Sequence, residues 1–131
     1  MIYQNLRDRT FRFALATIDF CRRLPGTWEA RRIGAQLLDC ATSVGANYRA
    51  SGRARSDAEF IAKIGTVVEE ADEAEYWLDL LAQANIHRSA QRDALAKEAA
   101  ELRGIFVASR HTAIRNRAQK RRGAAASPKP R

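Results

Sequence analysis

The sequence predicts an all-α protein, an antiparallel up-down-up-down four-helix bundle with a basic, disordered C-terminal tail. Only three prolines occur, and two of them lie in the last four residues, so long helices can form before the tail. Apolar residues recur at spacings of three and four, and no alternating strand pattern competes. Short connections place successive helices antiparallel. We assign 1–118 to the bundle and 119–131 to the tail.

The first two helices are predicted over 4–24 and 28–53. Pro25 and Gly26 end the first helix, and Thr27 is placed to cap the second. One apolar row of the first helix is expected to face the core, which leaves the second row as additional apolar surface. These two rows are Phe11, Ala14, Ile18 and Cys21, and then Phe13, Phe20 and Leu24. The inward row of the second helix is Ala30, Ile33, Leu37, Ala41, Val44 and Tyr48.

The third and fourth helices have clear starting signals. Ser56 with Glu59 three residues later forms a capping box, so the third helix begins near 57 and ends at Asn85. Ser89 opens the fourth helix, predicted over 90–118. The third helix has the inward row Phe60, Ile64, Val67, Ala71, Ala74, Leu78 and Leu81. The fourth has Leu95, Ala99, Leu102, Phe106 and Ala113.

Three glycines, Gly34, Gly45 and Gly52, fall on one narrow stripe of the second helix, with Arg49 and Arg53 at its edge. Each interior glycine destabilises a helix by about 1 kcal/mol relative to alanine. The stripe therefore indicates that another group comes close. Packing within the chain, a subunit contact and a ligand groove all remain possible. A loop that cradles phosphate does not, because the Walker spacing is missing.

The third helix carries a run of acids, whereas the second ends in basic residues. Because these helices are neighbours, we expect ion pairs between them, either within the chain or between subunits. Glu59, Lys63 and Glu70 flank the apolar row of the third helix, and Trp77 follows them. Asn47 is interpreted as a satisfied buried amide that fixes helix register.

The net charge of +8 lies entirely after position 109, where eight basic residues and no acid occur. Such a block is typical of an interaction tail, and phosphate contacts are one use for it. A tail that only aids solubility is the alternative. The candidate nucleic-acid-binding residues are Arg49, Arg53, Arg55, Arg110, Arg115, Arg117, Lys120, Arg121 and Arg122.

Several other kinds of chemistry are not supported by the sequence. Neither His87 nor His111 follows a carboxylate by three residues, so a di-iron bundle site is not indicated. Cys21 and Cys40 lack zinc-finger spacing with the histidines. We therefore expect no metal, no cofactor and no enzymatic activity. No membrane span or signal peptide is recognised, and the two cysteines fit free thiols in a cytoplasmic protein.

Three segments, "SVGANYR", "SGRARSDAEFIAKIG" and "EEADEAEYWLDLL", resemble the 23S rRNA intervening-sequence protein family. The resemblance implies a four-helix bundle that assembles into a ring-like homopentamer, encoded within rRNA genes. A related branch comprises accessory proteins of diversity-generating retroelements, which work with a reverse transcriptase and its RNA. Nucleic-acid binding is therefore implied. The matching positions are Ser43, Val44, Gly45, Asn47, Tyr48, Arg49, Glu59, Phe60, Lys63, Glu70, Ala71, Tyr76, Trp77 and Leu78.

The chain also has more apolar side chains than one bundle needs. Beyond the second row of the first helix, Ile61, Val68, Tyr76 and Trp77 lie off the inward row of the third. Large exposed apolar surfaces favour self-association.

Two functions remain open: a homo-oligomer that binds RNA or DNA, and a scaffold or accessory subunit for a protein partner. The residues assigned to helix packing or to an oligomer interface are Gly34, Gly45, Asn47, Tyr48, Gly52, Glu59, Lys63, Glu70, Tyr76 and Trp77.

Overall fold

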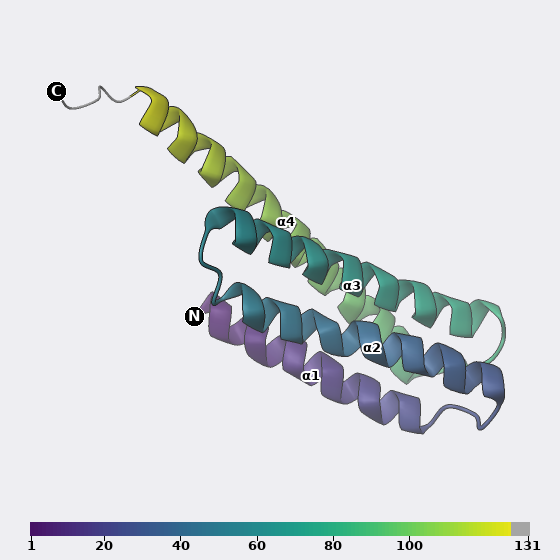
Figure 1. Cartoon of the computed structure of the whole chain (residues 1–131). Helices are drawn as coiled ribbons and strands as arrows, with labels where there is room; N and C mark the ends of the chain where they lie inside the picture. Colours follow the sequence, from purple (N-terminus) through teal and green to yellow (C-terminus); the bar gives the residue numbers. More distant parts are fainter. Residues whose placement is uncertain (127–131) are drawn as a thin grey trace.

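The computed structural model describes residues 1–126 and consists of four helices joined by short turns (Figure 1). They are α1 (Ile2–Arg22), α2 (Trp28–Ser51), α3 (Asp57–Gln83) and α4 (Ala90–Ala126). No strand is present over this part of the chain. The predicted all-α bundle is confirmed, and each helix packs against its neighbours in sequence, with a further contact between α1 and α4.

Contacts between helix ends show that neighbours run antiparallel. Gly52 at the end of α2 lies against Tyr3 at the start of α1, and Gly34 lies against Leu24 just after the end of α1. On the other side of the bundle, Lys120 of α4 pairs with Asp57 at the start of α3. The start of α1, the end of α2, the start of α3 and the projecting end of α4 therefore share one end of the bundle, as Figure 1 shows.

The helix boundaries follow the predicted caps. The Thr27 hydroxyl accepts a hydrogen bond from the Ala30 amide, and Ser56 accepts one from the Glu59 amide at 3.1 Å. The Glu59 carboxylate in turn accepts from the Arg55 amide. Asn85 has a φ of 57°, a left-handed conformation that asparagine tolerates, and it ends α3 as expected.

The core is built from the predicted inward rows of α2, α3 and α4, except that Ala113 of α4 is only half-buried, but the prediction for α1 is wrong. Phe13 and Phe20 are buried, whereas Phe11 of the other row is 64% exposed. The inward face of α1 also includes Thr10 and Thr17, whose hydroxyls donate to carbonyls of their own helix. These local hydrogen bonds satisfy the buried hydroxyl groups, so threonine can occupy a core position that a count of apolar residues misses.

Two further expectations differ from the structure. Ile61 is buried within the chain, and Val68 packs against the core, so neither remains as surplus apolar surface. Residues 119–126, expected to be disordered, continue α4 as helix. This part is rich in good helix formers, and Lys120 is held by Asp57 at 3.2 Å. The rest of the tail, 127–131, lies outside the described residues.

Candidate interaction surfaces

The glycine stripe of α2 is the place where α1 approaches most closely. A Cβ atom on Gly34 would lie 2.9 Å from Leu24 Cδ1, and one on Gly45 would lie 3.3 Å from Thr10 Oγ1. A Cβ atom on Gly52 would overlap the Tyr3 ring. Gly45 and Gly52 therefore accommodate α1, and Gly34 accommodates Leu24 just after α1, so the stripe serves packing within the chain.

The outer side of this α1–α2 contact is an apolar groove with a volume of about 800 Å³. We call it the α1–α2 groove. Phe11 and Leu15 contribute exposed apolar surface to it, and they are 64% and 50% exposed. Gly45 belongs both to the glycine stripe and to this groove, and Arg49 and Arg53 stand at one end. The other lining residues are Gln4, Arg7, Asp8, Thr10, Ala14, Ile18, Thr42 and Ala46.

Arginines from distant parts of the sequence gather at the end of the bundle where α4 projects. Arg49 lies in the last turn of α2, Arg53 and Arg55 lie in the connection that follows, and the end of α4 projects past the same end of the bundle (Figure 1). Among residues 1–126, no ion pair or side-chain hydrogen bond occupies the guanidinium groups of Arg49, Arg53, Arg55, Arg115, Arg117, Arg121 or Arg122. Unpaired cations of this kind are free to bind an anionic partner.

Two of the predicted nucleic-acid-binding residues are less available. Arg110 is half-buried and its Nε atom is buried without a hydrogen-bond partner. It crosses α3 at Gly65, where a Cβ atom would lie 3.2 Å from that Nε. Lys120 is engaged by Asp57. Gly65 was not singled out from the sequence, because no other glycine marks a stripe on α3.

The expected ion pairs between the basic end of α2 and the acidic run of α3 do not form within residues 1–126. The alternative, pairs between subunits, stays a prediction. Within residues 1–126, the acids of α3 pair with α4 instead. Arg103 binds Glu75 and lies 3.9 Å from Asp72, and Arg92 lies 3.8 Å from Asp79. The reason is geometric, because in an antiparallel pair the end of α2 lies beside the start of α3, several turns from these acids.

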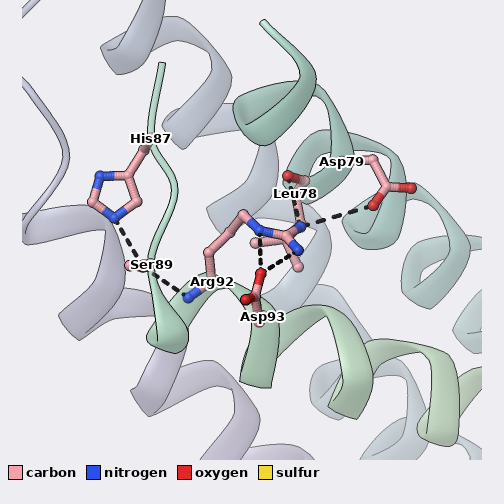
Figure 2. A network of polar contacts seen from close by, with 6 residues as sticks. All are labelled: Leu78, Asp79, His87, Ser89, Arg92 and Asp93. Atoms are coloured by element: carbon pink, nitrogen blue, oxygen red, sulfur yellow. Dashed lines mark hydrogen bonds and ion pairs between the residues drawn. The ribbon is translucent and has the colours of Figure 1, made fainter. Parts of the chain in front are cut away.

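The turn between α3 and α4 is fixed by a network around Arg92 (Figure 2). The Arg92 guanidinium donates to the Leu78 carbonyl at 3.1 Å and to the Asp93 carboxylate. Its backbone amide donates to Ser89, the predicted start signal of the helix. The Ser89 hydroxyl also lies 3.0 Å from His87 Nε2. His87 packs edge-on against Phe20, which ties the turn to the core.

The outer face of α3 remains acidic and partly aromatic. Tyr76 is 58% exposed and packs edge-on against Trp77, with 5.0 Å between ring centroids. Glu69 and Glu73 are exposed and form no ion pair within residues 1–126. We call the exposed residues Glu69, Asp72, Glu73, Tyr76 and Asp79 the Tyr76 face.

A cysteine and two glutamates meet between α2 and α3. Potential ligand atoms of Cys40, Glu70 and Glu73 lie within 4.8 Å of one another, and Cys40 is 2% exposed. Burial, with Glu73 beside it, raises the pKa of the Cys40 thiol far above its usual range. Burial also raises the pKa of Glu70, and the Glu73 charge adds to this effect. Sequence spacing could not reveal this group, because its members come from two helices.

The remaining predicted interface residues have local roles. The Asn47 amide donates to the Ser43 carbonyl one turn earlier, so it is satisfied within α2 and does not fix register against another helix. Tyr48 is buried between the rings of Tyr3 and Phe106. Lys63 is half-buried beside Arg53 and Glu59 in a shallow depression.

None of the four described helices is both long and apolar enough to cross a bilayer.

Fold and surfaces together define a small four-helix bundle with a basic helical projection. The profile of the 23S rRNA-intervening sequence protein family matches residues 4–108, and the chain belongs to this family. The fold is similar to the crystal structure of a Bacteroides thetaiotaomicron protein with unknown function from the S23 ribosomal protein family. The TM-score is 0.77 at 27% identity, over 85% of this chain and 99% of that one. The chain has no match among curated proteins.

Proposed function

We propose that this protein is a non-enzymatic homo-oligomer that binds nucleic acid, with RNA as the expected ligand, through the basic end of the bundle. The observation that carries the proposal is the gathering of unpaired arginines from α2, the α2–α3 turn and α4 at that end. The chain over 1–109 is neutral, so the positive potential is concentrated on the projecting helix. RNA is favoured over DNA because the family is defined by proteins of rRNA intervening sequences.

Self-association is supported by the apolar surface that the single chain leaves exposed. Phe11 and Leu15 on α1 and Tyr76 on α3 are each at least half exposed. Burying them would remove apolar area from water, worth roughly 25 cal/mol per Å². The family resemblance sets the expected number of subunits at five. The two cysteines are free, in keeping with a cytoplasmic protein.

The local role of the His87–Ser89 pair supports a non-enzymatic function. His87 and Ser89 lie within hydrogen-bond distance, which could suggest an activated hydroxyl. The same hydroxyl, however, caps α4 by accepting from the Arg92 amide. The His87 ring lies against Phe20 in a turn. The pair therefore stabilises the α3–α4 connection.

A protein-interaction scaffold or accessory subunit, for example for a reverse transcriptase, is the second candidate function. The observation that favours it is the α1–α2 groove, whose apolar lining can bury side chains of a partner. In that case the basic helix would be incidental. Salt separates the two functions, because phosphate contacts weaken steeply with salt and apolar contacts do not.

The decisive experiment measures RNA binding by fluorescence anisotropy at several salt concentrations. The triple variant Arg115→Gln/Arg121→Gln/Arg122→Gln removes three unpaired charges from the projecting helix. Its matched control, Arg22→Gln/Arg31→Gln/Arg32→Gln, removes three exposed arginines from the opposite end. We expect the first variant to lower affinity by at least about tenfold and to flatten the salt dependence by up to about 0.9 per lost phosphate contact. Equal losses in both variants would show binding without a defined site, and no RNA binding by the unmodified chain would refute the nucleic-acid role.

A further inference from the structure

The α1–α2 groove and the Tyr76 face carry opposite charges. Along each surface, charged and apolar side chains also follow one another in the same order. The α1–α2 groove has Arg49 and Arg53 at one end and Leu15 toward its middle. The Tyr76 face has Glu69, Asp72 and Glu73 at one end, Tyr76 after them and Asp79 at its far end. In both, a charged end is followed by an apolar part.

The lengths of these surfaces also agree. On the α2 side, the groove runs from Arg53 back to Thr42, eleven residues, or about 16 Å at 1.5 Å per residue. From Glu69 to Asp79 along α3, the Tyr76 face spans ten residues, or about 15 Å. The members of the Tyr76 face occupy roughly a third of the helix circumference at 100° per residue. One helix face of this width fits a groove between two helices.

Some charged groups on each side lack an ion-pair partner within residues 1–126, although Asp72 and Asp79 of the Tyr76 face lie 3.9 and 3.8 Å from Arg103 and Arg92 of the same chain. Arg49 and Arg53 form no ion pair in residues 1–126, and neither do Glu69 and Glu73. Arg7 lies over the Tyr3 ring, with 5.9 Å from its guanidinium carbon to the ring centroid. The groove has one acid, Asp8, which accepts a hydrogen bond from Gln4. Its net charge is therefore positive and that of the Tyr76 face is negative.

The floor of the groove suits an aromatic side chain. Ala14, Gly45 and Ala46 are small and leave room between the larger side chains of Phe11 and Leu15. Tyr76 is the largest exposed side chain of its face and its hydroxyl group has no hydrogen-bond partner within residues 1–126. Tyrosines that fill a partner's pocket often dominate the binding energy of an interface.

We propose that the α1–α2 groove of one copy receives the Tyr76 face of a second copy. This inference rests on the proposed homo-oligomer and names the surfaces that build it. The two surfaces are different patches of one chain, so the contact is head-to-tail, and repeating it builds a closed ring where the rotation allows. Arg49 and Arg53 then bind acids of the neighbour, and nucleic acid is left to Arg55 and the arginines of α4.

The test uses one variant of each surface and light scattering or native mass spectrometry. Leu15→Glu places a charge in the groove, and Tyr76→Glu places one on the opposite face. Both positions are at least half exposed in the single chain, so each subunit is expected to keep its helical circular dichroism. We expect each variant alone to be monomeric, with self-association weakened at least about tenfold, the effect of placing an unpaired charge in an interface.

Mixing the two variants tests the head-to-tail arrangement. The Leu15→Glu chain keeps an intact Tyr76 face and the Tyr76→Glu chain keeps an intact groove, so a one-to-one mixture should give dimers and nothing larger. Trp28→Glu is the control, because Trp28 is 78% exposed and belongs to neither surface. It should leave the assembly unchanged.

Each outcome separates this inference from the proposed function. A monomeric unmodified protein would refute the proposed assembly itself. An oligomer that both variants leave intact would refute only the assignment of these two surfaces. If Leu15→Glu lowered RNA affinity without changing the mass, the groove would be a nucleic-acid site and the inference would be wrong.

Discussion

The α1–α2 pair and the α3–α4 pair hold together by different kinds of contact. Between α1 and α2, Gly45 lets the α2 backbone approach Thr10, and Gly34 makes room for Leu24, which lies just after α1. Between α3 and α4, the long side chain of Arg103 reaches Glu75, and the large Phe106 side chain fills the core. The first contact depends on the absence of side chains and the second on their size and charge.

The two helix contacts should therefore respond differently to added side-chain volume and to added salt. A glycine contact is specified by shape, so added volume should disrupt it and salt should not. A contact with charged pairs loses part of its energy when salt screens them. The α3–α4 contact also contains a glycine, Gly65. It makes room for the Arg110 side chain, because a Cβ atom at Gly65 would lie 3.2 Å from Arg110 Nε.

The largest effect is expected for Phe106→Ala. Phe106 is fully buried and its ring lies 5.0 Å from that of Tyr48. Removing a buried phenylalanine side chain leaves a cavity, and we expect the free energy of unfolding to fall by about 3–5 kcal/mol. Chemical denaturation measures this loss. Ile114→Ala, on the exposed part of α4, is the control and should change stability by less than about 0.5 kcal/mol. A similar loss in both variants would mean that burial does not determine stability in α4.

The next effect is expected for Gly45→Leu, which overfills the α1–α2 contact. A Cβ atom there already lies 3.3 Å from Thr10 Oγ1, so we expect a loss of about 1–3 kcal/mol. Gly104→Leu is the matched control, because nothing lies within 4 Å of a Cβ atom at Gly104. That variant should be stabilised by up to about 1 kcal/mol through better helix propensity. If both leucine variants had the same melting temperature, the shape argument for α1–α2 would fail.

Gly45 illustrates which features could be predicted from the sequence and which could not. The helices, their caps at Thr27, Ser56 and Asn85, and three of the four inward rows follow from local patterns, and the structure confirms them. The stripe containing Gly45 could also be recognised, but its partner could not, because a pattern within one helix does not name the helix opposite.

The errors have physical reasons of their own. Phe11 was assigned inward because apolar periodicity does not count Thr10 and Thr17, whose hydroxyls are satisfied inside α1. The ion pairs of α3 were assigned to α2 because charge patterns do not say how far along two antiparallel helices the charges lie. The end of α4 was read as disordered because it lacks apolar periodicity, although alanine-rich helix needs none.

A smaller effect is expected where charge holds the α3–α4 contact. Glu75 is 20% exposed and pairs with Arg103, which raises the pKa of that guanidinium. We expect Glu75→Gln to lower the free energy of unfolding by about 0–1 kcal/mol at low salt, since the pair is partly exposed. The difference from the unmodified chain should shrink at 1 M salt, where the Debye length is about 3 Å. A difference that is independent of salt would indicate that the side chain acts through packing.

The smallest effect on stability is expected for removal of residues 119–131. Residues 119–126 are exposed, and the Lys120–Asp57 pair that the deletion removes is exposed too and worth about 0–1 kcal/mol. The same deletion removes five basic residues, Lys120, Arg121, Arg122, Lys129 and Arg131. RNA affinity should therefore fall and its logarithmic salt dependence should flatten by up to about 0.9 per lost phosphate contact.

A companion variant distinguishes the charge of this segment from its length. Lys120→Gln/Arg121→Gln/Arg122→Gln keeps the helix that ends at Ala126 and removes three of the charges. If charge is what binds RNA, this variant should reproduce most of the effect of the deletion on the salt dependence, with melting within a few degrees of the unmodified protein. If the deletion weakens binding and the companion does not, the helix contributes contacts other than phosphate neutralisation. An unchanged affinity and salt dependence in both would exclude the end of α4 from nucleic-acid binding, leaving Arg55, Arg115 and Arg117 as the remaining candidates outside the α1–α2 groove.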